Sequence, residues 1–166
     1  RPGDPEPLRY LAIHALGELK VAEAVPLLVK NIEYHCDEMD EPWDPPAFHT
    51  SPASRALAQI GMPAVLEILK PEVIRQAFGA RMWRYTSIVR YAMPNAATAY
   101  AFVAAYDPGG YDELARTRHA ELLERLAAFP GARAPVSDDN ANVQPGLVDW
   151  AAFEQLCQDD IEDPIP

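Results

Sequence analysis

The side chains best suited to chemistry gather between residues 33 and 50, in the stretch EYHCDEMDEPWDPPAFHT. Two histidines, one cysteine and six carboxylates there could act as metal ligands. A zinc site needs three or four Cys or His ligands at defined spacings, and these residues follow no familiar zinc spacing. A calcium loop arranges oxygen ligands around a glycine, and the stretch contains no glycine. We therefore expect a solvated acidic loop and no metal site. The ligands considered are His35, Cys36, Asp37, Glu38, Asp40, Asp44 and His49.

Cys36 is the candidate nucleophile of this stretch, because His35 precedes it directly. A catalytic Cys–His pair is defined by geometry in the fold, which adjacency in the chain does not supply. The surrounding carboxylates also raise a thiol pKa, so that less of the reactive thiolate forms. We therefore predict no catalytic residue and no enzymatic activity. An enzyme, or a small-ligand or metal site within residues 33–50, stays the alternative, because long loops often carry function.

A second group combines arginines with aromatic residues. The segment Val73–Tyr106 contains four arginines, seven aromatic residues and no acidic residue. On a helical wheel, Trp83 and Arg90 point away from the apolar stripe of this segment, and Arg84 and Tyr91 lie beside them. Such residues are enriched at interface hot spots, so we predict that these four residues form a protein interface. Two alternatives remain: Trp83 contacts the next pair of helices, or the acidic C-terminal segment pairs with the arginines.

The elements that position these residues are predicted from an internal repeat. LRYLAIHALGELKVAEAVPLLVKNI at Leu8–Ile32 returns in degenerate form as PASRALAQIGMPAVLEILK at Pro52–Lys70, with Ala15 and Ala56 lying 41 positions apart. That period is typical of stacked helical hairpins, in which no single unit buries its own apolar face. No β-type alternation occurs, so we predict an all-α fold. The 166 residues form a single domain with a hairpin at 5–32, a loop at 33–51, a hairpin at 52–69, helices over 72–129, and a loop with a short acidic segment at 134–166.

Helical spacing also predicts on which face of a helix individual residues lie. The first helix places Leu8, Leu11/Ala12, Leu16 and Leu19 at helical spacing. The histidines His14 and His119 lie on faces expected to be exposed. The helix over residues 111–129 aligns four apolar residues on one face, namely Leu114, Leu122, Leu126 and Phe129.

The repeat also carries a family resemblance. RYLAIHALGELKVAEAVPLLVKNI at residues 9–32 resembles a HEAT repeat of the short kind seen in phycobilisome-lyase-like proteins, and RALAQIGMPAVLEIL at 55–69 resembles a second, clipped one. The two copies cover about a quarter of the chain. The resemblance implies an α-solenoid, a right-handed stack of helix pairs that presents a surface to a protein partner. The bilin-attachment chemistry of the lyases does not carry over, because no residue matches a catalytic signature. The insertion at 33–50 makes the array irregular.

The net charge of −11 argues against general nucleic-acid binding, which needs clustered Lys and Arg. Residues 33–50 and 134–166 contain 14 of the 25 acidic residues and no Lys or Arg, so the remaining body is mildly basic. No apolar run is long enough for a membrane helix. The chain begins with Arg1 rather than Met, which indicates processing or trimming. A cytoplasmic location is therefore favoured, while a removed export signal stays open. Cys36 and Cys157 fit either two thiols or one disulfide.

Together these observations predict a non-catalytic scaffold domain that binds a protein or peptide and uses no cofactor, nucleic acid or membrane. The predicted interface residues are Trp83, Arg84, Arg90 and Tyr91.

Overall fold

The computed structural model describes residues 5–35, 51–76, 79–92, 96–105 and 113–136. Every regular element among these residues is a helix, so the predicted all-α class is confirmed there. The elements are α1 (Pro5–Glu18), the short 3-10 helix η1 (Ala22–Ala24), α2 (Val25–Lys30), α3 (Pro52–Ile60), α4 (Met62–Ile68), α5 (Pro71–Ile74), α6 (Gly79–Ala92), α7 (Ala96–Ala105) and α8 (Glu113–Ala127).

Prolines begin several of these helices. Pro52 and Pro71 are the first residues of α3 and α5, and Pro63 is the second residue of α4. The first turn of a helix leaves its N–H groups without intrahelical partners, so a residue that lacks an N–H fits there without loss. Gly61 separates α3 from α4 with a φ of 86°, a conformation that favours glycine.

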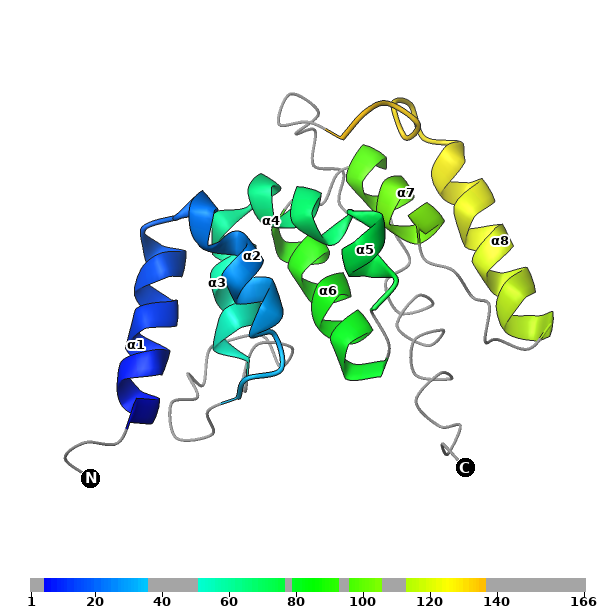
Figure 1. Ribbon diagram of the computed structural model, residues 1–166. Coiled ribbons are helices and arrows are strands. Elements are labelled where there is room, and N and C mark those ends of the chain that lie inside the picture. Colours follow the sequence, from blue (N-terminus) through cyan, green and yellow to red (C-terminus); the bar gives the residue numbers. More distant parts are fainter. Residues whose placement is uncertain (1–4, 36–50, 77–78, 93–95, 106–112, 137–166) are drawn as a thin grey trace.

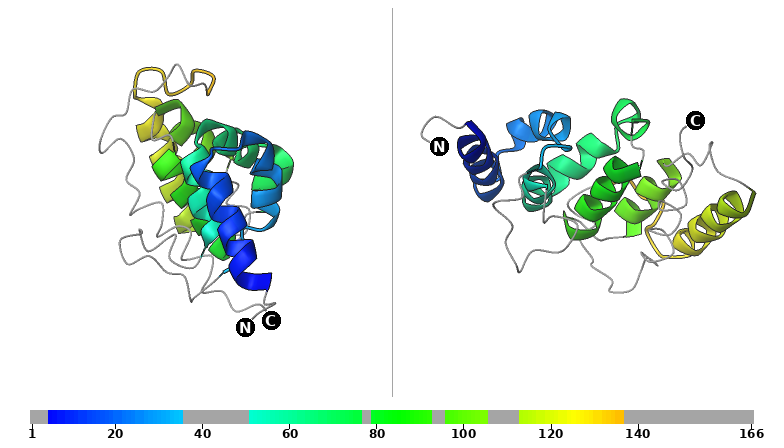
Figure 2. Two further views of the ribbon diagram at one scale, coloured as in Figure 1. Left: turned by 90° about the vertical axis from the view of Figure 1, so that its left-hand side faces the viewer. Right: turned by 90° about the horizontal axis from the view of Figure 1, so that it is seen from below.

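The helices pack in two rows. α3 lies between α1 and α6 and packs against both, while α2 packs on α3 and α4, and α4 also contacts α6. Figures 1 and 2 show α1, α3 and α6 side by side, with α2 and α4 covering them from one side and α8 beyond α7 at the other end. One core runs through this arrangement. Its largest fully buried side chains are Leu28, Ile32, Leu57, Val65, Ile68, Tyr85, Ile88, Phe102 and Leu126.

The contact between α1 and α3 is made at a glycine. A Cβ atom placed on Gly17 would lie 2.7 Å from the Cα of Ala56, 2.9 Å from its Cβ, and against Oε1 of Gln59. These distances are well below van der Waals contact, so only glycine allows the two helices to lie this close. α1 therefore turns the side that contains Tyr10, Ile13 and Gly17 to the core.

The leucines whose spacing predicted the first helix lie mostly outside the core. Leu8, Leu11 and Leu19 are exposed, and Leu16 is only partly buried. The pattern identified the helix, but α1 has apolar residues on two sides. The side with the smallest residue packs on α3, because it allows the closest approach of the two backbones.

His119 corrects a prediction from the sequence. It was expected on an exposed face, but it is buried and its Nε2 lies 2.8 Å from the carbonyl oxygen of Val103. α8 packs on α7 through His119, Leu122 and Leu126, which share one face at helical spacing. Leu114, expected on that face, is exposed. His14 is partly exposed and stacks on Tyr10.

Candidate functional site

The predicted interface residues all lie on α6. The central residues of this helix are buried whichever way they point. Tyr85, Thr86, Ser87, Ile88 and Val89 are all buried, so the accessible residues of α6 lie toward its two ends. This burial follows from the position of α6, which packs against α3, α4 and α7. A surface on α6 is therefore built from its ends and not from one continuous face.

The structure places the predicted residues in two separate locations. Arg84 lies near the start of α6, while Arg90 and Tyr91 lie at its end. Arg84 and Tyr91 share a face two turns apart, about 10 Å along the axis at 1.5 Å per residue. Ser87 lies between them on that face and is buried, so the two locations are not joined by exposed α6 side chains. Trp83 belongs to α6, but its side chain lies outside the described part.

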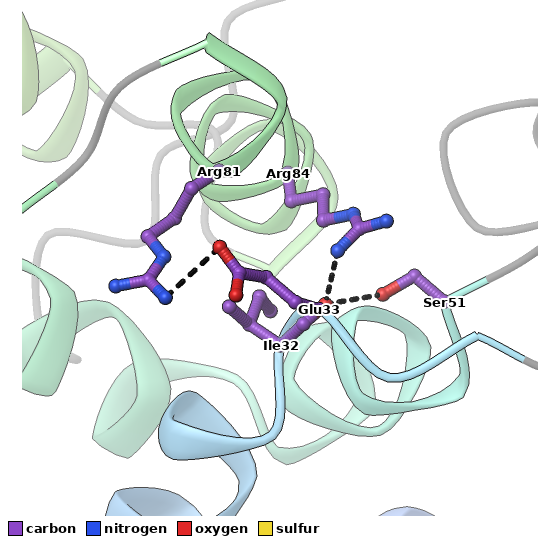
Figure 3. Close-up of polar contacts among 5 residues, drawn as sticks. All are labelled: Ile32, Glu33, Ser51, Arg81 and Arg84. Carbon is purple, nitrogen blue, oxygen red and sulfur yellow. Dashed lines mark hydrogen bonds and ion pairs between the residues drawn. The ribbon is translucent and has the colours of Figure 1, made fainter.

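Arg84 makes a contact within the chain. Its Nη1 donates a hydrogen bond of 2.6 Å to the backbone carbonyl of Ile32, 52 positions earlier. The hydroxyl of Ser51 donates to the same carbonyl at 3.2 Å (Figure 3). Since Ser51 has one hydroxyl proton, its 2.7 Å contact with the Ser54 hydroxyl is a bond donated by Ser54. Ile32 precedes the acidic insertion and Ser51 follows it, so these bonds hold the two ends of residues 33–50 together on α6.

Arg81 adds an ion pair one turn before Arg84. Its guanidinium lies 3.0 Å from a carboxylate oxygen of Glu33, the first acidic residue of the insertion (Figure 3). The sequence had suggested that an acidic segment of the same chain could pair with the arginines, with the C-terminal segment as the candidate. The described pair uses Glu33 instead, and residues 137–166 lie outside the described part.

Burial sets the electrostatics of this cluster. Desolvation lowers the pKa of Arg84; the carboxylate of Glu33 opposes this shift and the charge of Arg81 adds to it. Desolvation likewise raises the pKa of the neighbouring Tyr85 hydroxyl. The guanidinium of an arginine in a protein keeps its proton near neutral pH. Arg84 is therefore a charged, half-buried donor that anchors a backbone carbonyl.

Arg90 and Tyr91 form the second location. The guanidinium carbon of Arg90 lies 5.6 Å from the centroid of the Tyr91 ring, within the range of a cation–π contact. The Tyr91 residue is 48% exposed, and Arg90 is partly exposed. A partner at this end of α6 would meet an aromatic surface and a positive charge together.

The candidate ligands of the insertion are mostly beyond what the structure describes. His35 is exposed, while Cys36, Asp37, Glu38, Asp40, Asp44 and His49 lie outside the described residues. Within the described ranges, no group of three or more His, Cys, Asp or Glu side chains could hold a metal ion. Of the helices in those ranges, none is long and apolar enough to cross a membrane.

Sequence reasoning missed the partners of the arginines. The acceptor for Arg84 is a main-chain carbonyl, which no side-chain pattern reveals. Ser51 did carry a signal, because a serine directly before Pro52 marks the start of a helix. Glu33 also carried one, as an acidic residue at the edge of the insertion.

Comparison with protein-family models, with curated proteins and with solved structures finds no match to this chain.

Proposed function

We propose that this chain is a HEAT-like helical-repeat domain, an α-solenoid that binds another protein or a peptide without catalysing a reaction. The repeated sequence supports this arrangement, since Ala15 and Ala56 occupy equivalent places in α1 and α3. The packing of α3 between α1 and α6, with α2 and α4 alongside, also fits a stack of helix pairs. Repeat arrays of this kind use extended stacked surfaces to hold partners.

The observation that carries the proposal is the contact between the exposed Tyr91 and the partly exposed Arg90. Tyrosine and arginine dominate interface hot spots, because each buries a large area and also offers a polar or charged group. The cation over the ring fixes the orientation of both side chains before a partner arrives. We therefore propose a partner segment that places an apolar side chain on Tyr91 and an Asp or Glu beside Arg90.

Trp83 remains a predicted contact of this surface. Arg84 has a different role in the proposal, because its guanidinium is engaged by the Ile32 carbonyl. Its replacement would act through the base of the insertion and not through direct partner contact.

The test is capture of partners from a lysate of the source organism, with the wild-type chain compared with Tyr91→Ala and Arg90→Glu. Leu66→Ala is the control for the first change, because Leu66 is 47% exposed on α4, and Arg75→Glu is the control for charge reversal. A protein retained by wild type and both controls but lost by both variants supports the proposal. Equal capture by all five chains would exclude this surface.

A ligand or catalytic site at residues 33–50 is the second candidate function. It is favoured by the anchoring of both ends of this segment through Ile32 and Ser51. Ligand or metal screening by thermal shift separates the two functions. Stabilisation that is lost when residues 36–50 are replaced by a Gly/Ser linker would support the second candidate, and no stabilisation by any ligand would count against it.

A further inference from the structure

The contact between Arg90 and Tyr91 lies in a part of the chain that contains no acidic residue. The helices α6 and α7 contain three arginines and no Asp or Glu. Tyr91 is exposed and Arg90 is partly exposed, so the ring and the positive charge are both accessible at the end of α6. A segment that covers this pair must therefore bring its own carboxylates.

The chain itself contains a segment of matching composition. Residues 137–166 include eight acidic residues and no Lys or Arg. Within this segment, Asp149 directly precedes Trp150, and Glu154 directly follows Phe153. Each of these neighbouring pairs joins an aromatic ring, which can pack on a tyrosine, to a carboxylate, which can bind an arginine. The composition of residues 149–154 is thus complementary to the pair on α6.

The described chain ends next to the helices that form this surface. The guanidinium carbon of Arg133, three residues before the last described residue, lies 5.8 Å from the centroid of the Tyr100 ring on α7. Figures 1 and 2 show the orange end of the described chain beside α7. α7 begins four residues after the end of α6, a span of at most about 14 Å. Residues 137–166 therefore leave the described part close to the end of α6.

The intervening chain is long enough to bring the segment to this surface. Trp150 follows Val136 by 14 residues, and a flexible linker of that length spans about 20 Å on average. Such a tether gives an effective concentration on the order of millimolar, so a contact that is weak between separate molecules is populated within one chain. The insertion at residues 33–50 is also acidic, but its two ends are held by Arg84 and Ser51 at the Ile32 carbonyl, toward the start of α6.

We propose that residues 149–154 cover Arg90 and Tyr91 in the unbound chain and that a partner must displace them. Trp150 packs on the Tyr91 ring, and the carboxylates of Asp149 and Glu154 lie beside Arg90. Exposed ion pairs contribute little to stability, so a partner with a better fit displaces the segment readily. Regulation by this contact rests on the proposed function, because displacement matters only if a partner binds there, whereas the contact itself does not.

Paramagnetic NMR of the full chain tests the contact. Cys36→Ser leaves Cys157, three residues after Glu154, as the attachment site for a nitroxide label. The label should broaden the amide signal of Tyr91 and leave the signals of α1, at the other end of the row of helices, unchanged (Figure 1). Arg90→Glu should remove the broadening at Tyr91. Arg75→Glu, an exposed charge reversal at the end of α5, is the matched control and should retain it.

A charge exchange tests the pairing itself. Adding Asp149→Lys and Glu154→Lys to Arg90→Glu restores opposite charges, so the broadening at Tyr91 should return. Trp150→Ala should weaken the broadening, whereas Trp43→Ala, the same change beside an acidic residue of the insertion, should leave it unchanged. A labelled chain without broadening at Tyr91, or broadening that survives Arg90→Glu with unchanged helical circular dichroism, would overturn the proposal.

Partner capture separates this inference from the proposed function. If both hold, Trp150→Ala should retain more of the captured partner than wild type, and Trp43→Ala should retain the same amount as wild type. Broadening at Tyr91 without any captured partner would refute the proposed function alone. A captured partner without broadening at Tyr91 would refute the internal contact alone.

Discussion

Replacing Arg84 with methionine tests whether this residue is an internal anchor or a partner contact. Methionine keeps much of the apolar stem but removes the donor to the Ile32 carbonyl at 2.6 Å. A hydrogen bond from a charged group contributes about 1.5–3 kcal/mol to stability. Ser51 still donates to the carbonyl, and the guanidinium is only half-buried. We therefore expect a loss near the lower end, about 1–2 kcal/mol in the free energy of unfolding.

Urea denaturation followed by circular dichroism measures this loss, with Arg75→Met as the control. Arg75 is exposed at the end of α5, and a surface substitution of this kind changes the free energy of unfolding by about 0.5 kcal/mol or less. A loss for Arg84→Met that is no greater than the loss for Arg75→Met would refute the anchoring role. Partner capture lost by Arg84→Met with unchanged stability would refute it as well.

A double-mutant cycle sharpens this prediction. In a Ser51→Ala background the Ile32 carbonyl depends on Arg84 alone, so Arg84→Met then leaves a buried acceptor without either donor. We expect Arg84→Met to lower the free energy of unfolding by about 1 kcal/mol more in the Ser51→Ala background than in wild type. Strict additivity of the two substitutions would show that the two donors do not share this carbonyl.

Two further predictions concern the core. Gly17→Ala gains about 1 kcal/mol of helix propensity. It also forces a methyl group against the Ala56 backbone, and such an overlap costs about 1–3 kcal/mol. We therefore expect net destabilisation. The exposed Ala12→Gly calibrates the propensity in the same helix by urea denaturation, and a stabilised Gly17→Ala would contradict the close approach. Burial raises the pKa of the Tyr85 hydroxyl above its ordinary 10.0. The folded state therefore keeps this proton at pH values where the unfolded chain loses it, and the free energy of unfolding falls as the pH rises above 10. Tyr85→Phe should flatten this alkaline decline in urea midpoints relative to wild type, and an equal decline in the variant would contradict the assignment.

The sequence was sufficient to predict the all-α class of the described residues. The helical spacing of apolar residues, the positions of the prolines and Gly61 are all local signals. They are informative because helix formation depends mainly on local geometry and on an apolar side. The internal repeat, in which Ala56 is equivalent to Ala15, also predicted that α1 and α3 are related units. The structure places these two helices next to each other.

Tertiary structure alone decided which side of α1 faces inward and what the arginines contact. α1 has two apolar sides, and the glycine side is buried because Gly17 allows the closest approach to Ala56. Leucines at helical spacing could not reveal this, since hydrophobicity measures the benefit of burial but not the distance between two backbones. Arg84 illustrates the same limit. Its acceptor is a carbonyl 52 positions away, every residue carries such a carbonyl, and only the folded path of the chain brings this one to α6.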